Sequence, residues 1–506
     1  MTEPLRHPDI DWAALAPVLT LLGTACFVLL VGVFLPRGVR RPFAAFFAAA
    51  GLVAAGIVAG ILFALDDEAT TLVRDSLARD RLAELGQIFV AGAGLLAVGV
   101  AYFESRGPRG DDPRVAEDDW RERVVEWYVL LLTAAAGMAF FVQANSLITL
   151  FLGLEWFSIA LYVLCAINVH RVAALEAGLK YLIVGSFGSA ILLFGSAFVY
   201  GGAGGLTFGE IAAGAADGER LFLVAGLAMI LVGLAFKVSA APFHMWTPDV
   251  YEGAPTPVTA FMSAATKIAA LVLTLRLLLT AFPGEEELWT IAIAVIATIS
   301  LAWGNIAALT QRSVKRLLAY SSVSHAGFLL MPIAAGNALG GRALLFYLVP
   351  YAALSIGSFA VVAARERELA ADVTLDNLAG FGWERPFHAI AMAVFMFGFI
   401  GLPPAGLFLG KFYVFTAVYE RGWTWLVIVG VVATVVSVAY YLAVVRAMYS
   451  GSAELRTAPA GGSPPRDWPL TGTVLACLVL AVATLVVPDP LVDLARDSLA
   501  FLSFPF

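Results

Sequence analysis

Long apolar runs, separated by short polar or Gly/Pro-rich breaks, make up most of this chain. A helix needs about 20 apolar residues to cross the hydrocarbon core of a bilayer, and fourteen runs are long enough. The predicted spans are 11–35, 42–65, 82–104, 124–142, 145–168, 172–200, 220–246, 256–281, 288–309, 313–335, 341–364, 384–419, 423–450 and 470–487. The pattern predicts an all-α polytopic membrane protein. The first run is too long, and its flanks too acidic, for a cleavable signal peptide.

Helix breakers interrupt the seventh and the twelfth predicted spans. Pro242 should open the seventh span around 238–242, because a proline removes a backbone hydrogen bond and frees the carbonyl of Val238. The Gly-Leu-Pro-Pro sequence at 401–404 should likewise free the carbonyls at 399–400. The breaks lie five spans apart, which predicts two five-helix repeats, spans 4 to 8 and spans 9 to 13. Because five is odd, the second repeat must be inverted in the membrane.

These repeats divide the chain into four segments. Residues 1–123 are an N-terminal three-helix segment followed by a charged cytoplasmic loop. The first five-helix repeat is 124–281, and the second is 288–450. Residues 451–506 hold a Gly-, Ser-, Ala- and Pro-rich cytoplasmic loop and the last helix.

Composition supports the same class of protein. The 506 residues are 60% hydrophobic and only 14% charged, and the mean hydropathy is +0.87, values that no soluble globular chain of this length shows. We expect no bound nucleotide or nucleic acid, because no Gly-rich phosphate loop, basic groove or long extramembrane segment is present. Cys26, Cys165 and Cys477 lie far apart in apolar runs, so their spacing predicts neither a disulfide nor a metal site.

Basic residues are distributed unevenly between the two sets of loops. Loops that follow odd-numbered spans carry 18 of the 31 lysines and arginines, the opposite side with the termini carries eight, and five lie within spans. The positive-inside rule therefore places the basic loops in the cytoplasm and both termini outside. The bias also favours an even number of spans.

Lysine is rare, and its placement indicates chemistry inside the membrane. The chain has five lysines. Four of them lie inside predicted spans, namely Lys180, Lys237, Lys267 and Lys411, while Lys315 lies at the very start of the tenth span and is counted with the basic loop residues. An ammonium in hydrocarbon costs about 2.5–3.5 kcal/mol on insertion scales, so it normally faces a protein interior or a wet cavity. Desolvation lets a buried lysine lose its proton near neutral pH, whereas arginine keeps its proton. Lys237, Lys267 and Lys411 lie well inside their spans near the helix breaks, a pattern typical of an ion path.

Two further ionisable groups are candidates for that path. Glu155 lies near the middle of the fifth span, where a carboxylate protonates unless a cation pairs with it, and its alternative role is a structural salt bridge. The tenth span contains a polar cluster of Tyr320, Ser321, Ser322, Ser324 and His325. Hydroxyls beside an imidazole can hold water and pass protons, although such groups also join helices by hydrogen bonds.

The remaining polar positions have simpler interpretations or stay open. We expect Glu84 to be an interfacial carboxylate and Arg276 to be an anchor at the outer interface. Tyr440, Tyr441, Tyr449 and Arg446 read as an interfacial belt.

Glu176 and Lys180 are four residues apart on one helix face, which suits either a local ion pair or a role in proton uptake. His244, just beyond the first break, suits either a proton relay or a buried core residue.

Three motifs resemble one family. The stretch Phe-His-Met-Trp-Thr-Pro-Asp-Val-Tyr-Glu-Gly-Ala-Pro-Thr at 243–256, between Lys237 and Lys267, resembles the N subunit of bacterial respiratory complex I. Lys-Arg-Leu-Leu-Ala-Tyr-Ser-Ser-Val-Ser-His-Ala-Gly-Phe at 315–328 is similar to that subunit too, as is the Gly-Leu-Pro-Pro segment with Lys411. The resemblance covers most of 125–450. The Asp-Val-Tyr-x-Gly-Ala-Pro element is fairly specific, because sibling subunits and Mrp-type antiporters differ there.

The resemblance implies fourteen helices, two inverted five-helix repeats with a half-channel in each, and a central line of charged residues. By motif match, Glu155 and Lys237 form the charged pair of the first half. Lys267 is the bridging lysine, and Lys411 is the terminal lysine of the second half; His325 joins these as a proton relay.

The implied function is proton translocation as subunit N of NADH–quinone oxidoreductase in the bacterial inner membrane. Such a chain holds no NADH, flavin or iron–sulfur cluster itself. Its partners would be the other membrane-arm subunits and the lipid bilayer, with a peripheral flavin/iron–sulfur arm in the same assembly.

Three other functions would also suit a polytopic chain of this kind. An Mrp-type sodium/proton antiporter subunit would need clustered carboxylates and carbonyl oxygens for sodium, whereas the buried set here is one glutamate against three lysines. The equivalent subunit of a ferredoxin- or hydrogenase-driven complex stays open from sequence. A structural subunit without an ion path is disfavoured by the buried lysines.

Overall fold

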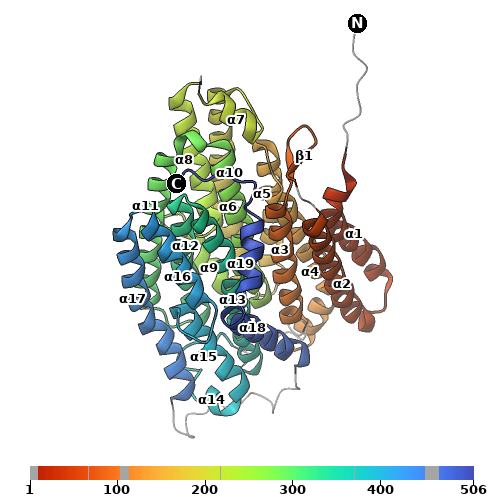
Figure 1. The fold of residues 1–506 in the computed structure, drawn as a ribbon. Coiled ribbons are helices and arrows are strands. Elements are labelled where there is room, and N and C mark those ends of the chain that lie inside the picture. The colour runs from red at the N-terminus through yellow and green to blue at the C-terminus, as the bar shows by residue number, and fades with distance from the viewer. Residues whose placement is uncertain (1–9, 66–67, 103–112, 217, 370, 451–466) are drawn as a thin grey trace.

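The chain forms a bundle of helices that run roughly side by side (Figure 1). The computed structural model describes residues 10–506 except 66–67, 103–112, 217, 370 and 451–466, and it leaves the side chains of 113–122 undescribed. The long helices are α1 (Trp12–Phe34), α2 (Arg37–Leu65), α3 (Arg81–Ala101), α4 (Pro113–Val142), α5 (Leu147–Cys165), α6 (Val172–Ala203), α8 (Arg220–Lys237), α10 (Thr256–Ala281), α11 (Glu286–Ala308), α12 (Val314–Ala335), α13 (Ala338–Leu369), α17 (Thr424–Tyr449) and α18 (Trp468–Val486).

Shorter elements complete the described part of the chain. They are the antiparallel strands β1 (Thr70–Leu72) and β2 (Leu77–Arg79), the 3₁₀ turn η2 (Pro283–Glu285), and the helices α7 (Phe208–Gly214), α9 (Trp246–Gly253), α14 (Phe381–Glu384), α15 (Pro386–Ile400), α16 (Leu407–Glu420) and α19 (Asp489–Asp497). Except for the two broken spans, the sequence pattern predicted none of these short elements. Three-residue strands and one- or two-turn helices are too short to give a periodic signal.

Thirteen of the described helices are long and apolar enough to cross a membrane. The pair α15 and α16 supplies one further crossing, so each of the fourteen predicted runs coincides with a helix or with a broken pair. The all-α polytopic class is therefore confirmed. The inverted relation between the two five-helix repeats stays a prediction.

Both predicted breaks are present. In the seventh span, α8 ends at Lys237 and α9 begins at Trp246. In the twelfth span, α15 ends at Ile400 and α16 begins at Leu407. The prolines predicted both interruptions correctly, because neither segment can continue a helical hydrogen-bond ladder.

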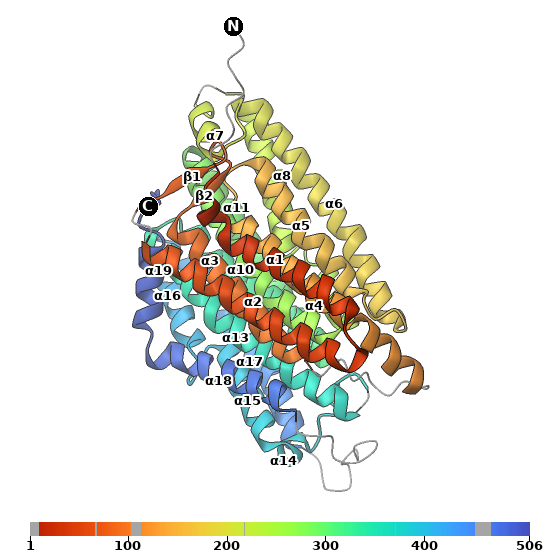
Figure 2. The same cartoon turned by 90° about the vertical axis from the view of Figure 1, so that its right-hand side faces the viewer.

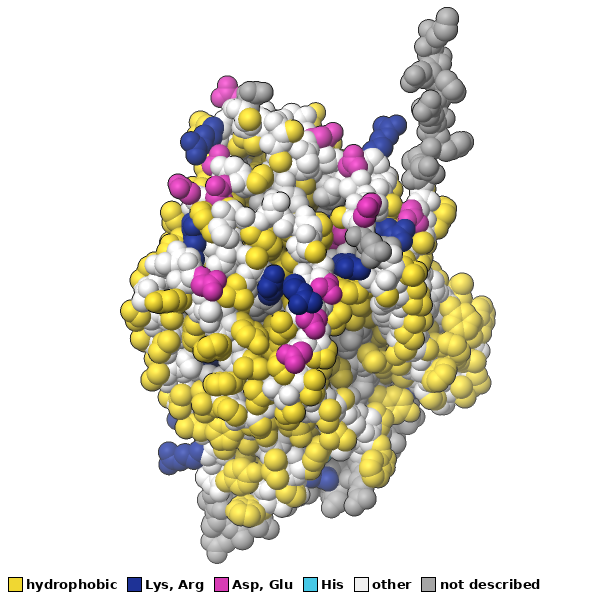
Figure 3. Space-filling model, viewed as in Figure 1, with side chains coloured by type: hydrophobic (Ala, Val, Ile, Leu, Met, Phe, Trp, Pro, Cys, Tyr) yellow, Lys and Arg dark blue, Asp and Glu magenta, His cyan; other side chains and the backbone are white. Residues whose placement is uncertain are grey.

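The centre of the bundle is formed by α10, α12 and α13, whose apolar stretches are 100%, 94% and 94% buried. Figure 1 places α1 and α2 at one flank and α17 at the other, and Figure 2 shows α6 and α8 along a third side. Apolar side chains cover the middle of the surface in Figure 3, while charged side chains gather mainly toward its upper end. This distribution is the one expected for helices that face lipid.

Contacts at one end of the bundle bring the two ends of the chain together. Asp11, the N-cap of α1, is bonded to Arg79 at 2.5 Å. The neighbouring Asp80, which caps α3, is bonded to Arg276 near the end of α10. The guanidinium of Arg276 lies 5.8 Å from the ring centre of Phe501. The start of α1 and the C-terminal segment therefore lie at the same end, as an even number of crossings requires.

Two charged residues interpreted as interfacial are instead buried. Arg276 is 1% exposed, and its guanidinium donates to both carboxylate oxygens of Asp80 at 2.5 and 2.7 Å. Glu84, on the first turn of α3, is also 1% exposed. Both interpretations were wrong. A position near the end of a span reads as interfacial in the sequence, but here neighbouring helices and the C-terminal segment cover that level of the bundle.

Candidate ion path

The first helix break presents a free carbonyl, and a lysine occupies it. Pro242 removes the backbone donor that would have bonded to Val238, and Ser239 takes a left-handed conformation (φ 63°) as the chain leaves α8. The Nζ of Lys267, which is completely buried in α10, donates to the Val238 carbonyl. The ammonium and the opened helix thus satisfy each other, which explains why the lysine and the break occur together.

The second break repeats this arrangement. The Nζ of Lys411 in α16 donates to the carbonyl of Ile400 at 2.9 Å and to the hydroxyl of Thr434 at 3.3 Å. Gly401 turns the chain with φ +88°, and a Cβ at this position would lie only 2.7 Å from Cδ of Lys411. Glycine therefore serves two needs here, a left-handed turn and space for the lysine side chain.

Lys237, the last residue of α8, is 1% exposed and has a different partner. Its Nζ donates to Oγ of Ser158 in α5 at 2.7 Å, and the Ser158 hydroxyl in turn donates to the carbonyl of Leu154. Four aromatic rings have their centres 5.4–5.7 Å from Nζ, those of Phe157, Tyr162, Tyr181 and Phe236. The rings stabilise the ammonium through cation–π contacts.

Glu155 makes no ion pair with Lys237 within 4.0 Å, so the paired arrangement that the resemblance implied is not formed in this structure. One buried carboxylate oxygen of Glu155 has no hydrogen-bond partner among the described residues. Ser158 lies three residues further along α5 and takes the lysine in its place. Glu155 nevertheless lies near this bond, because Glu155 and Ser158 lie on adjacent turns of one face of α5.

His325 lies at the centre of a group of hydroxyls. Its Nδ1 is hydrogen-bonded to the hydroxyl of Tyr347 at 2.8 Å, and its Nε2 to that of Tyr441 at 3.1 Å. Ser322 of the predicted cluster is bonded to Tyr351 at 3.1 Å. Both ring nitrogens are engaged, so a proton taken up at one can be released at the other.

The sequence pattern alone did not connect these tyrosines with His325. Tyr347 and Tyr351 are four residues apart in α13, a spacing that would have placed both on one face. The interpretation of Tyr440 and Tyr441 as an interfacial belt was wrong, because both are buried and hydrogen-bonded, to Asn305 and His325 respectively. That face of α17 packs against α11 and α15.

The four cationic or imidazole groups lie on successive neighbouring helices. Lys237 ends α8, Lys267 lies in α10, His325 in α12 and Lys411 in α16, and α10 contacts both α8 and α12 while α12 contacts α16. The ring of Phe328 lies near both of the last two groups, with its centre 5.9 Å from that of His325 and 4.2 Å from Nζ of Lys411. The structure thus brings the predicted groups together in a line across the interior.

Lys237, Lys267 and Lys411 are all hydrogen-bonded to neutral oxygens. Among the described residues, no carboxylate lies within 4.0 Å of any of the three ammonium groups, which are bonded to hydroxyls and carbonyls. A proton can therefore leave any of them without breaking an ion pair, and a buried amine is a stable neutral group.

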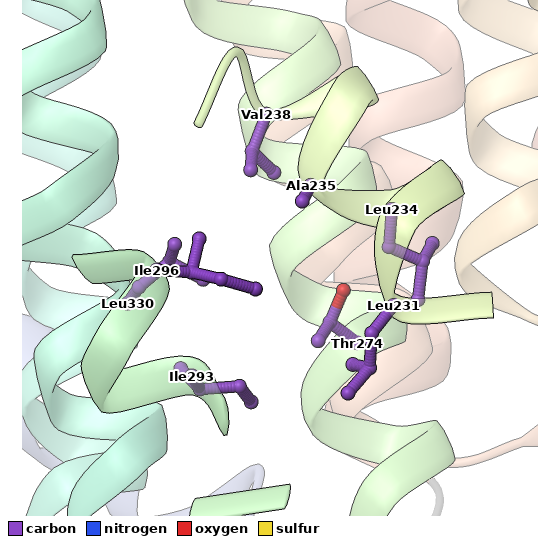
Figure 4. A pocket seen from close by; sticks show the side chains of 8 residues that line it. All are labelled: Leu231, Leu234, Ala235, Val238, Thr274, Ile293, Ile296 and Leu330. Carbon is purple, nitrogen blue, oxygen red and sulfur yellow. The ribbon is translucent and has the colours of Figure 1, made fainter. Parts of the chain in front are cut away.

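A small cavity beside the first break is unsuited to proton transfer (Figure 4). Its volume is about 10 Å³, and apolar side chains of α8, α11 and α12 line it together with Val238 and Thr274. Its one hydroxyl, that of Thr274, is bonded to the carbonyl of Ala270 in its own helix. A buried water needs two to four polar partners, so this site favours a dry contact between the two halves.

Two further polar residues, His244 and Lys315, lie near the first break or beyond it. His244 lies in the first break, 7% exposed, with its ring centre 6.0 Å from that of Trp303; its role as a relay stays a hypothesis. Lys315, grouped in the sequence with the cytoplasmic cations, is buried. Its Nζ donates to the carbonyl of Ala254 at 2.9 Å and to Thr256 at 3.1 Å.

Comparison with known proteins identifies the family. A family profile described as "NADH:quinone oxidoreductase/Mrp antiporter, TM" matches residues 144–437. An NADH-quinone oxidoreductase subunit N from Chloroflexus aggregans is 37% identical over 99% of both chains. The chain belongs to the NADH-quinone oxidoreductase subunit N family. Another member, from Parvibaculum lavamentivorans, is 44% identical over 72% of this chain and 75% of its own length.

Solved structures agree with this assignment. A chain of respiratory complex I from Thermus thermophilus is 31% identical, with a TM-score of 0.77 over 95% of this chain and 99% of that chain. Chains of an archaeal membrane-bound sulfane sulfur reductase (23% identical, TM-score 0.83) and of the Mrp complex from Dietzia sp. (20%, TM-score 0.81) each match over 96% of this chain and 97% of their own. At those identities they show a shared fold alone. The resemblance to subunit N is confirmed.

The subunit N element Asp-Val-Tyr-Glu-Gly-Ala-Pro forms most of α9 and joins the two halves of the bundle. Asp249 accepts from Lys180 of α6 at 2.8 Å and from Arg316 of α12 at 2.7 Å. Lys180 also forms the predicted pair with Glu176, at 2.7 Å. This partly exposed cluster fixes α9, the second part of the broken span, and a role for Glu176 and Lys180 in proton uptake stays a hypothesis.

Proposed function

We infer that this chain is the proton-translocating subunit N of a respiratory NADH–quinone oxidoreductase. The observation that carries the inference is the line of Lys237, Lys267, His325 and Lys411 through the bundle, with a lysine on the freed carbonyl at each helix break. It occurs in a chain that matches subunit N relatives over nearly its full length. Buried ionisable groups beside broken helices at membrane depth are characteristic of ion translocation.

The chain's own contribution is to hold protons and to change how firmly it holds them. The bond from Lys237 to Ser158 stabilises the charged amine, and loss of that bond favours release. Lys267 and Lys411 hold their protons against the carbonyls of Val238 and Ile400, so a shift of either break changes the stability of the adjacent ammonium.

Between Lys267 and Lys411, the imidazole of His325 with its two tyrosine hydroxyls supports transfer in either direction. Moving one proton against 100 mV takes about 2.3 kcal/mol. A rearrangement of one or two charge-assisted hydrogen bonds supplies that amount. Movement of Glu155 toward Lys237 would stabilise the ammonium further, which gives the unpaired carboxylate a role in loading the first site.

The redox chemistry belongs to partner proteins. The chain would lie among the other membrane-arm subunits in the bacterial inner membrane, and a peripheral flavin/iron–sulfur arm would supply the energy. We place both termini on the outer side, on the basis of the 18-to-8 distribution of basic residues and the even number of crossings.

The antiporter and sulfane sulfur reductase alternatives share the fold, but their sequences are less similar to this chain than those of subunit N relatives. The Mrp complex and the sulfane sulfur reductase match at 20% and 23% identity, whereas subunit N relatives match at 37% and more. Sodium transport would also need clustered carboxylate and carbonyl oxygens, whereas Lys237, Lys267 and Lys411 are bonded to hydroxyls and carbonyls with no carboxylate among the described residues within 4.0 Å.

The test is purification from native membranes in mild detergent, followed by proton uptake in membrane vesicles. Flavin and iron–sulfur subunits should copurify with this chain. Quinone reduction by NADH should drive proton uptake into the vesicles, and this uptake should be lost when Lys237 is replaced. Copurification with antiporter or hydrogenase subunits instead would contradict the proposal.

A further inference from the structure

A groove on the outside of the bundle leads to Lys237. It lies between α4, α5 and α6 and has a volume of about 840 Å³; α5 packs against both α4 and α6. Apolar side chains line most of it, while Arg123 and Glu126 of α4 lie toward the end that we assign to the cytoplasm. One lining residue differs from the rest, because Tyr162 also contacts the ion path: Nζ of Lys237 lies 5.7 Å from the centre of its ring.

Three hydroxyls near this point have no hydrogen-bond partner among the described residues. They belong to Tyr162, Tyr181 and Ser189, and each of these side chains is at least 95% buried. A buried hydroxyl without a partner is costly, so native proteins satisfy such groups, commonly with ordered water. Space for the Tyr162 hydroxyl exists because residue 185 is glycine; a Cβ there would lie 2.3 Å from this oxygen.

The ammonium of Lys237 has the same need. An ammonium has three N–H donors, and among the described residues Lys237 uses one of them in its hydrogen bond to Ser158. The ring centres of Tyr162 and Tyr181 lie 5.7 and 5.5 Å from the same nitrogen. Unsatisfied donors and unsatisfied hydroxyls at one place can all be satisfied by the same few water molecules.

The polar side chains also follow one face of α5. Glu155, Ser158 and Tyr162 are spaced at i, i+3 and i+7, which places them on one stripe of the helix. Because α5 ends at Cys165, Tyr162 is the member of the stripe nearest the mouth of the groove. The stripe therefore connects the groove to Ser158, to Lys237 and then to Glu155.

We propose that the α4–α5–α6 groove is the port through which water and protons reach Lys237, and that the hydroxyl of Tyr162 is its inner relay. The inference rests on the proposed function, since it names the supply route of the same site. A proton would pass from water in the groove to the Tyr162 oxygen as that hydroxyl releases its own proton inward, so the tyrosine is neutral before and after.

The decisive variant is Tyr162→Phe, which keeps the ring and removes the hydroxyl. In vesicles containing the whole complex, proton uptake per quinone reduced, normalised to assembled complex, should fall at least threefold, and the solvent deuterium isotope effect should change. The matched control is Tyr128→Phe, which removes another buried hydroxyl without a partner, from α4. Tyr128→Phe should behave as the parent enzyme; equal uptake in Tyr162→Phe and the parent would overturn the proposal.

Blocking the groove gives a second measurement. In a Cys26→Ser background, Val163→Cys places a thiol at an exposed lining position, and Leu152→Cys places one on the same helix outside the groove. Treatment with methyl methanethiosulfonate should lower proton uptake only in the Val163 variant, and dithiothreitol should restore it. If that thiol does not react in the assembled complex, the groove is closed by a partner and the proposal fails.

The proposed function is tested separately by Lys237→Ala. If that variant loses proton uptake while Tyr162→Phe keeps it, the route is wrong and the function stands. If Lys237→Ala pumps normally, the function assigned to the site is what fails.

Discussion

Replacing Lys237 by arginine separates the two roles that a buried cation can have, a fixed charge and a proton carrier. Arginine keeps the positive charge and can still donate to Ser158, but a guanidinium does not release its proton in a protein. Alanine removes the charge and the carrier together. Because Lys237 forms no ion pair with Glu155, alanine leaves no newly unpaired carboxylate, and both variants should assemble.

The size of the effect follows from the contact. Lys237 Nζ lies 2.7 Å from Oγ of Ser158, a charge-assisted bond of the class that contributes about 1.5–3 kcal/mol. This is the size of the roughly 2.3 kcal/mol needed to move a proton against 100 mV. A larger guanidinium among four rings costs about 1–3 kcal/mol in overpacking, so Lys237→Arg should lower the amount of complex but not abolish it.

The assay is quinone reduction and proton uptake measured in the same vesicles, normalised to assembled complex. Both Lys237→Arg and Lys237→Ala should lose at least about tenfold in coupled proton uptake, a barrier change of about 1.4 kcal/mol. Lys180→Arg is the matched control, because Lys180 is partly exposed and acts as an ion-pair partner that arginine can replace. Full coupled activity in Lys237→Arg would refute the reasoning, because the lysine would then be a fixed charge and the carrier role would pass to Lys267 and Lys411.

Two further predictions concern architecture. Asp80→Asn leaves the buried guanidinium of Arg276 without a counter-ion and should destabilise the subunit by about 3–5 kcal/mol. The measurement is the loss of assembled complex on heating. The control is Asp376→Asn in the exposed pair with Arg312, which should change stability by less than about 1 kcal/mol. Cysteines at Gly38 and Gly284, both with open space around a new Cβ, should react with a membrane-impermeant reagent from opposite sides, Gly284→Cys from outside and Gly38→Cys only after the membrane is opened.

The Asp80 and cysteine-labelling predictions would each be contradicted by a specific result. Equal heat stability of Asp80→Asn and Asp376→Asn would mean that the buried pair is replaceable by a neutral hydrogen bond. Labelling of Gly38→Cys in sealed cells would reverse the orientation, and labelling of both positions from one side would contradict the predicted number of crossings between them.

The sequence by itself determined the features that are local to the backbone. Run length gave the spans, because crossing a bilayer needs a fixed length of apolar helix. The prolines near 242 and 404 gave the breaks, because a proline cannot donate a backbone hydrogen bond whatever surrounds it. The rare lysines marked the path for the same reason, since burying an ammonium is costly in any fold. The motif around Asp249 identified the family.

Only the tertiary structure decided which side chains meet. In a membrane protein the lipid-facing and the protein-facing sides of a helix are both apolar, so the sequence gives little information on how each helix is rotated. For that reason the sequence pattern suggests an interfacial position for Tyr441, which is bonded to His325, and an anchoring role for Arg276, which is paired with Asp80. The choice of Ser158 rather than Glu155 as the partner of Lys237 depends on how α5 and α8 are held by α6, which contacts both helices, and no local pattern records this. The buried lysines and the helix breaks could therefore be predicted from the sequence. The hydrogen-bond partner of each proton-carrying group depends on how the packed helices are rotated.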